Sequence, residues 1–299
     1  MINYKKPIIV LAGPTATGKS SKAIKLAKDI KGVIINADSR QIYKELKIGT
    51  AQPKPDTIKE KCWYIDGIKH YLYGHISIKE RYNLYQYQRD VQDVLDKEKS
   101  IPILIGGTGL YIDSVVYNYN LSSSQNDNPD FSRKKLNKMD VKELQSIIKK
   151  DTLQELIHSD VNNPTRLIRI IERGGRNRKK GEPLNHIYIV TDIDMQNLKK
   201  NIVKRVNEMF DQGLIEENRH LIECGYSYDL SSMHSIGYQE FEGYFENKKS
   251  IEQIKQEIIL HTTQYAKRQR TWFKKNETTV KVKNYKQIYD SVLNFLSTS

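Results

Sequence analysis

Cysteine is scarce in this chain of 299 residues, and long apolar runs are absent. The two cysteines, Cys62 and Cys224, stand far apart and belong to no paired Cys/His pattern. A structural zinc site needs about four ligands at short spacings, so we predict reduced thiols and no zinc centre. No apolar stretch approaches the roughly 20 residues of a membrane span. The chain starts directly with a strand-like segment and no signal-peptide pattern, so we expect a cytoplasmic location and no membrane partner.

Acidic residues are in the minority: 36 Asp and Glu stand against 49 Lys and Arg, which gives a net charge of +13. Such an excess favours a polyanionic partner, because each phosphate contact releases counterions. A lysine-rich composition can equally be a general bias, so charge alone leaves nucleic-acid binding open. The proportions of 38% hydrophobic and 28% charged residues indicate a globular protein with a sizeable core.

Strand-like and helix-like segments alternate along much of the chain. Short apolar runs predict buried strands at residues 7–12, 33–38, 101–107 and 186–193. Apolar residues at helical spacing predict helices at residues 21–30, 85–97, 195–223, 250–275 and 284–296. The alternation predicts an α/β fold with a parallel sheet that is flanked by helices on both faces.

The character of the chain changes between residues 118 and 186. Residues 118–130 are polar and rich in turn-forming types, whereas 131–175 have helical spacing. We therefore predict a core of residues 1–118 and 186–299 with a small helical insertion domain at 119–185. No internal repeat and no heptad seam is evident, so a monomer is expected.

The segment GPTATGKS matches the GxxxxGK[ST] phosphate-binding loop in full, and it lies between a predicted strand and a predicted helix. Glycines let the backbone N–H groups point inward, and the helix directs its positive end at the same place. The lysine adds a charge for the terminal phosphate, and the serine hydroxyl can ligate Mg²⁺. We predict a P-loop NTPase-like core whose phosphate site is Gly13, Pro14, Thr15, Ala16, Thr17, Gly18, Lys19 and Ser20, with Ser20 as the metal ligand.

An acid is missing where phosphate-transfer enzymes with this loop usually have one. Their second strand ends in an Asp that completes the Mg²⁺ shell, but here the 101–107 strand ends in glycines. The acid is instead Asp38, the last residue of the predicted strand at 33–38. Spacing alone leaves open whether Asp38 serves the metal or acts as a general base.

Eight segments, in order, resemble the tRNA dimethylallyltransferase family. They are GPTATGKS, NADSRQIYKELKIGTAQP, HYL, GGTGLY, NNPTRLIR, KRVNEMFDQGLIEE, SIGYQEF and TQYAKRQRTWF. The resemblance implies transfer of a dimethylallyl group from dimethylallyl diphosphate to the N6 amine of the adenosine 3′ of the anticodon. It also implies that the P-loop binds the donor's diphosphate with Mg²⁺, and that the insertion grips the tRNA anticodon stem-loop.

The resemblance carries roles onto particular residues. Asp38 matches the proposed base, and Thr108 and Arg205 match contacts at the diphosphate or reaction centre. The residues that match tRNA contacts are Asp38, Ser39, Arg40, Gln41, Thr165, Arg166, Leu167, Ile168 and Arg169. A basic run at 173–180 becomes a candidate for phosphate contact once an RNA partner is implied. In the last of the eight segments, Trp272 and Phe273 are expected in the core.

Three other functions remain open at this stage. A P-loop kinase of a small metabolite would turn over ATP and would not need the basic insertion. A relative that prenylates free AMP or ADP would share the core without an anticodon-binding part. A non-enzymatic RNA-binding module would have a vestigial P-loop, but the intact Lys19, Ser20 and Asp38 argue against decay.

Overall fold

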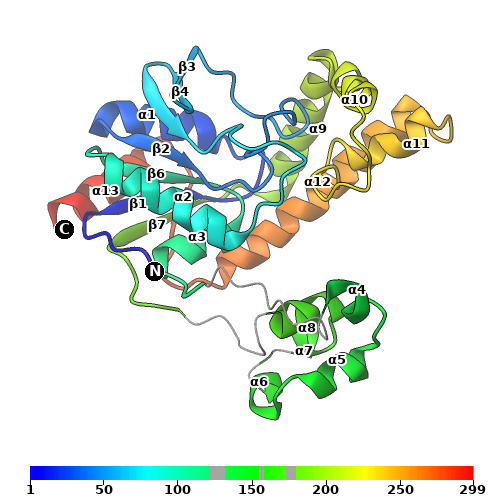
Figure 1. Cartoon of the computed structure of the whole chain (residues 1–299). Helices are drawn as coiled ribbons and strands as arrows, with labels where there is room; N and C mark the ends of the chain where they lie inside the picture. Colours follow the sequence, from blue (N-terminus) through cyan, green and yellow to red (C-terminus); the bar gives the residue numbers. More distant parts are fainter. Residues whose placement is uncertain (122–131, 155, 157, 173–179, 299) are drawn as a thin grey trace. The chain divides into compact units, whose positions relative to one another are not determined.

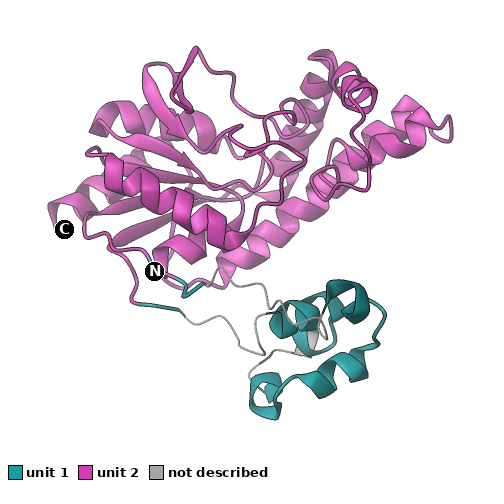
Figure 2. Cartoon of the chain, in the orientation of Figure 1, with its two compact units in different colours: residues 1, 119–181 teal, residues 2–118, 182–299 magenta. Residues whose placement is uncertain are grey.

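The computed structural model describes residues 1–298 except 122–131, 155, 157 and 173–179. It divides into two compact units (Figure 2). The core unit comprises Ile2–Asn118 and Glu182–Ser299, and the helical unit comprises Tyr119–Gly181 together with Met1. Among the helices described, none combines the length and the apolar character needed to cross a membrane.

A mixed sheet forms the centre of the core unit (Figure 1). Its described strands, in spatial order, are β3 (Thr57–Lys59), β4 (Cys62–Ile65), β5 (Ile68–Tyr71), β2 (Val33–Asn36), β6 (Pro102–Gly106), β1 (Ile8–Ala12), β7 (His186–Thr191) and β8 (Val280–Val282). Strands from β5 to β8 pair in parallel, as predicted, and β1 and β6 are buried at every position. Continuous apolar runs suit such strands because helices cover both of their faces.

Helices cover the two faces of this sheet. On one face, α1 (Lys19–Ile30) and α13 (Tyr285–Ser297) bury residues such as Leu26 and Ile288 against Ile9. On the other face, α2 (Leu84–Lys97) and α3 (Gly109–Val116) pack around Leu104. The fold is therefore the predicted α/β sheet core flanked by helices.

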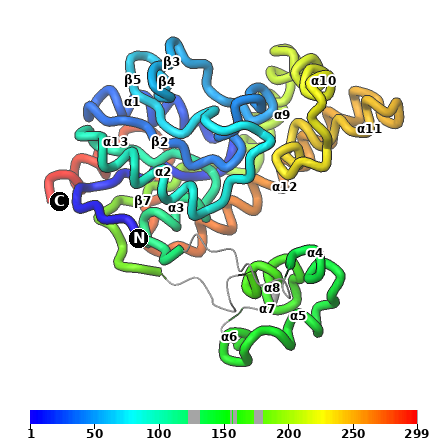
Figure 3. Tube along the Cα trace, in the orientation of Figure 1, coloured from blue at the N-terminus to red at the C-terminus, as the bar shows by residue number. Residues whose placement is uncertain are grey.

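A second cluster of helices extends the core unit beyond the sheet (Figure 3). It contains α9 (Met195–Asp211), α10 (Leu214–Glu223), the short 3₁₀ helix η2 (Gln239–Phe241), α11 (Glu242–Phe245) and α12 (Ile251–Lys274). The predicted single helix at 195–223 is wrong, because the chain breaks at Gly213 with φ +95° and starts α10 there. The strands β3, β4, β5 and β8 were not predicted. They have three or four residues each, and β3 is fully exposed.

The helical unit has its own small core. Its helices are α4 (Arg133–Leu136), α5 (Val141–Ile147), α6 (Lys150–Gln154), α7 (His158–Val161) and α8 (Pro164–Ile171). The α8 helix starts with Pro164 after Asn163, whose side chain accepts a hydrogen bond from the Arg166 N–H. Leu136 and Leu144 pack with the apolar face of α8.

Candidate active site

The P-loop occupies residues 13–20, between the end of β1 and the start of α1. Gly13 has φ +144°, and a Cβ there would lie 2.5 Å from Thr191 Oγ1 and 2.6 Å from the Thr191 carbonyl oxygen. Only glycine fits this approach to β7. Ala16 and Gly18 also have positive φ values, of 61° and 71°. The loop therefore has the curled backbone that the sequence motif predicts.

Polar side chains from three distant elements hold this loop. The Thr17 hydroxyl lies 2.9 Å from Thr191 Oγ1 at the end of β7. From α12, Gln269 Oε1 accepts a hydrogen bond from the Thr15 N–H at 2.9 Å. From α9, Asn201 Nδ2 donates to the Ala16 carbonyl at 3.0 Å. The loop shape is thus imposed by the surrounding structure as well as by its own sequence.

Two cations meet at the loop. Lys19 Nζ donates to the Pro14 carbonyl at 2.5 Å, and Arg205 Nη1 donates to Thr15 Oγ1 at 3.0 Å. Burial and the positive charge of Arg205 lower the pKa of Lys19 to about 7. Charges held this close in a desolvated place repel each other, so the arrangement favours a bound anion.

Asp38 lies beside these cations, just after the end of β2. Its negative charge acts to raise the pKa of both Lys19 and Arg205 against the larger lowering effect of burial. The carboxylate oxygen Oδ1 accepts a hydrogen bond from the Arg40 N–H at 2.9 Å, and the Asp38 N–H donates to Asn36 Oδ1 at 2.9 Å. One hydrogen bond therefore holds the half-buried carboxylate and another fixes the backbone of the same residue.

Thr108 ties the neighbouring strand end to the segment after Asp38. Its hydroxyl oxygen accepts from the Ser39 N–H at 3.0 Å and lies 3.3 Å from Ser39 Oγ. The hydroxyl of Tyr265, on α12, lies close to Thr108, and burial together with the charge of Asp38 raises the pKa of Tyr265. Thr108 is predicted to contact the reaction centre, and in this structure its hydroxyl positions Ser39.

Gln41 is committed to the protein backbone. Its amide nitrogen donates to the Thr50 carbonyl at 2.9 Å and to the Ala51 carbonyl at 3.0 Å. These bonds use both amide hydrogens. The amide hydrogens are therefore taken up by the protein in this conformation, and the tRNA contact of Gln41 stays a prediction. Arg40, by contrast, is partly exposed and donates from Nη1 to the Ser231 carbonyl at 3.2 Å.

The model of the IPP transferase family matches residues 41–276 of this chain. The chain belongs to the IPP transferase family. A curated relative from Acholeplasma laidlawii, named tRNA dimethylallyltransferase, is 37% identical over 275 residues, which is 90% of this chain and 89% of the relative. Another of that name, from Natranaerobius thermophilus, is 33% identical over 91% of this chain and 84% of its own length.

Solved structures of IPP transferases have the same fold. The crystal structure of the full-length tRNA isopentenylpyrophosphate transferase from Bacillus halodurans matches with a TM-score of 0.73 at 27% identity, over 98% of each chain. The P-loop NTPase-like fold predicted from the sequence is therefore confirmed.

Several side chains that shape this IPP transferase site were not singled out from the sequence. They are Thr191, Asn201, Tyr265 and Gln269. Gln269 is only 4% exposed, and besides Thr15 it reaches Gly107, donating from Nε2 to that carbonyl at 2.9 Å. Tyr265 and Gln269 are four residues apart in α12, so they share one helix face. The spacing indicates a shared face for these two residues, but it does not show that this face meets the P-loop.

The residues of the helical unit that are predicted to contact tRNA fall into an exposed group and a buried group. Thr165, Arg166 and Arg169 are exposed on α8. Leu167 and Ile168 are 0% and 4% exposed and pack in the core of the unit, so contact through their side chains is a wrong prediction. The basic run at 173–180 lies outside the described residues except for Lys180.

At the end of α12 the two predicted core aromatics also differ. Phe273 is buried against the sheet, as expected. Trp272 is 39% exposed, so its assignment to the core is wrong. Its indole Nε1 donates to Asp113 Oδ2 at 3.0 Å, and its ring lies so close to Gly109 that a Cβ there would be 2.2 Å away. The polar N–H explains this placement at the surface.

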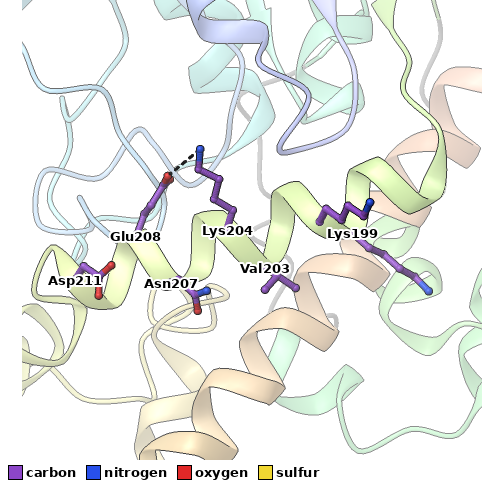
Figure 4. A pocket seen from close by; sticks show the side chains of 7 residues that line it. Lys199, Val203, Lys204, Asn207, Glu208 and Asp211 are labelled. Carbon is purple, nitrogen blue, oxygen red and sulfur yellow. Dashed lines mark ion pairs between the residues drawn. The ribbon is translucent and has the colours of Figure 1, made fainter.

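A separate pocket of about 630 Å³ runs along the surface of α9 (Figure 4). Its lining is Lys199, Lys200, Val203, Lys204, Asn207, Glu208 and Asp211. Lys204 and Glu208 point toward one another, with Nζ and Oε1 3.8 Å apart. The lining includes neither a P-loop residue nor Asp38, so this surface pocket is distinct from the candidate active site.

Proposed function

We propose that this chain transfers a dimethylallyl group from dimethylallyl diphosphate to the N6 amine of the adenosine 3′-adjacent to the anticodon in tRNA, and releases diphosphate. The observation that carries the proposal is Asp38 beside two cations, Lys19 of the P-loop and Arg205 of α9. Membership of the IPP transferase family supports it, as do the curated relatives named tRNA dimethylallyltransferase.

The P-loop side of the site suits a diphosphate leaving group. As the bond between the prenyl carbon and the diphosphate oxygen breaks, both bonding electrons stay on the oxygen. Lys19 and Arg205 stabilise this growing negative charge more in the transition state than in the substrate, which lowers the barrier. Inward N–H groups of the loop add to the same effect.

The Asp38 side of the site suits proton removal from the acceptor. The adenine amine is a weak nucleophile because its lone pair is delocalised into the ring. As the carbon–nitrogen bond forms, the amine loses a proton, which Asp38 accepts as a general base. The target base has to leave its stack to reach a carboxylate in this position. Ser39 and Arg40, which follow Asp38, are the candidates for contact with the tRNA there.

The core unit also fits a Mg²⁺ ion that enters with the diphosphate. Among the described residues no group of three or more His, Cys, Asp or Glu gathers into a metal site. The Ser20 hydroxyl is exposed at the start of α1 and is an oxygen donor of the kind Mg²⁺ accepts. Ser20 together with diphosphate oxygens would hold the ion, which supplies further charge neutralisation when bound.

The experiment incubates the protein with Mg²⁺ and labelled dimethylallyl diphosphate, and with either bulk tRNA or AMP. The proposal predicts label in tRNA at an adenosine next to the anticodon. Label in AMP would identify an adenylate prenyltransferase instead. Release of phosphate from ATP without prenyl transfer would identify a small-metabolite kinase, and either outcome would overturn the proposal.

A further inference from the structure

A carboxylate on α10 holds a turn that borders the diphosphate cradle. Glu217 accepts hydrogen bonds from three consecutive backbone N–H groups, those of Lys47, Ile48 and Gly49, at 3.0 to 3.3 Å. Within the described residues no lysine, arginine or histidine lies within ion-pair distance of this carboxylate. Its partners are therefore backbone donors, and such charge-assisted bonds fix backbone geometry.

Tyr238 completes this attachment. Its hydroxyl donates to Glu217 Oε1 at 2.6 Å and accepts from the Gly49 N–H at 3.1 Å. The ring is fully buried, and a Cβ on Gly49 would lie 2.5 Å from it. Burial raises the pKa of Tyr238 well above its usual value, so the hydroxyl keeps the proton that it donates. We call Glu217 and Tyr238 the turn clamp.

The clamped turn leads directly to a contact with Arg205, one of the two cations of the site. The next residue, Thr50, offers its carbonyl to Arg205 Nη2 at 3.3 Å and to Gln41 Nε2 at 2.9 Å. Arg205 uses its other terminal nitrogen for Thr15 of the P-loop. Two fixed acceptors determine how a planar guanidinium is oriented, and the other N–H groups of its five keep a defined direction.

We propose that the turn clamp, Glu217 with Tyr238, is a positioning device that orients Arg205 toward the diphosphate. It acts through the Thr50 carbonyl and touches no substrate itself. This inference rests on the proposed function, since the diphosphate is the ligand that Arg205 would meet. Its consequence is that loss of the clamp weakens diphosphate binding through Arg205 and not through a general loss of folding.

The test measures the affinity for inorganic pyrophosphate with Mg²⁺ by calorimetry in Glu217→Gln and Tyr238→Phe. Both substitutions keep side-chain size and remove part of the clamp. We expect each to weaken pyrophosphate binding about tenfold, the order of a lost charge-assisted hydrogen bond. If one variant fails to fold, the other still decides the question.

A matched control is available on β5, outside the turn clamp. Tyr71 donates a hydrogen bond to Glu98 there, so Tyr71→Phe removes the same kind of Tyr–Glu bond. Thermal unfolding of this control and of the two clamp variants compares their losses of stability. The control is expected to bind pyrophosphate like the parent protein even where its melting temperature falls as much as that of the clamp variants.

A double-mutant cycle separates positioning from structure. In the Arg205→Ala background, Glu217→Gln and Tyr238→Phe are expected to change pyrophosphate affinity by less than about twofold, because the group they position is gone. Full tenfold effects in that background would overturn the inference, as would parent-like affinity of both variants. If the parent protein itself binds no pyrophosphate, the proposed function fails together with the inference. If the parent binds pyrophosphate and the clamp variants bind it equally well, only the inference fails.

Discussion

Arg205 on α9 donates a hydrogen bond to Thr15 of the P-loop at 3.0 Å across a separation of 190 residues. This contact joins the helix cluster outside the sheet to the loop at the end of β1. It explains why a site that begins as a local sequence motif depends on a residue far away in the sequence. Tertiary packing determines the position of the Arg205 guanidinium, whereas the loop supplies the backbone donors.

Arg205→Ala is expected to weaken pyrophosphate binding by about 10- to 100-fold, the range for a hydrogen-bonded charge. Arg205→Lys is expected to recover only part of the loss, because an ammonium cannot contact Thr15, Thr50 and an anion in one plane. Calorimetry with Mg²⁺-pyrophosphate checks this. Lys199→Ala, on the surface pocket of the same helix, is the control and should bind like the parent.

The pH dependence of anion binding follows from Lys19. Its pKa is lowered to about 7 in the free protein, and a bound diphosphate raises it because opposite charge favours the protonated form. Binding above pH 7 therefore takes up a proton, and affinity falls as the pH rises from 7 toward 9. Below pH 7 Lys19 is already charged, so its contribution stays constant.

Lys19→Met provides the control for this titration, because pyrophosphate itself also gains and loses protons. The ratio of parent to Lys19→Met affinity removes that common effect. We expect the ratio to be flat below pH 7 and to fall above it, with proton uptake visible in buffers of different ionisation enthalpy. A ratio that stays constant from pH 6 to 9 would contradict the assignment.

Gln269→Leu should loosen the P-loop. It leaves the Thr15 N–H and the Gly107 carbonyl without their buried partner, at about 1–3 kcal/mol for each unpaired group. We expect a lower melting temperature together with weaker pyrophosphate binding. Gln264→Leu, at an exposed position of the same helix, should change neither quantity. Parent-like stability of Gln269→Leu would show that the loop holds its shape without α12.

In the helical unit, different residues of α8 are expected to serve folding and tRNA contact. Leu167→Ala removes a fully buried side chain and should destabilise this unit by about 2–5 kcal/mol. Arg166→Ala with Arg169→Ala should leave its fold intact and weaken tRNA binding, with a shallower dependence of affinity on salt. Circular dichroism and salt-dependent binding assays measure the two effects. Unchanged tRNA affinity in the double variant would remove α8 from the interface.

The sequence predicted those features that depend on local patterns. The P-loop between β1 and α1, the buried strands and Asp38 at the end of β2 follow from apolar runs and residue spacing. The strand β3 could not be found this way, because an exposed strand of three residues has no apolar signature. Gly213, which separates α9 from α10, is a helix-ending signal that the apolar spacing on either side obscured.

The residues that support the site show more clearly what sequence patterns cannot predict. Gln269 and Asn201 look like ordinary polar helix residues until α12 and α9 pack beside the P-loop. Gln41 matched a tRNA contact of the family, but the turn at 50–51 takes up its amide hydrogens. Such roles arise from contacts between segments more than a hundred positions apart, or from backbone turns that residue type does not reveal.

The central claim is that Asp38 accepts the proton of the attacking amine, and single-turnover prenyl transfer in Asp38→Asn tests it most directly. With tRNA and dimethylallyl diphosphate saturating, we expect the rate to fall by about 10²- to 10⁴-fold. Binding of tRNA and of pyrophosphate should stay near that of the parent. A transfer rate within a few-fold of the parent would contradict the account.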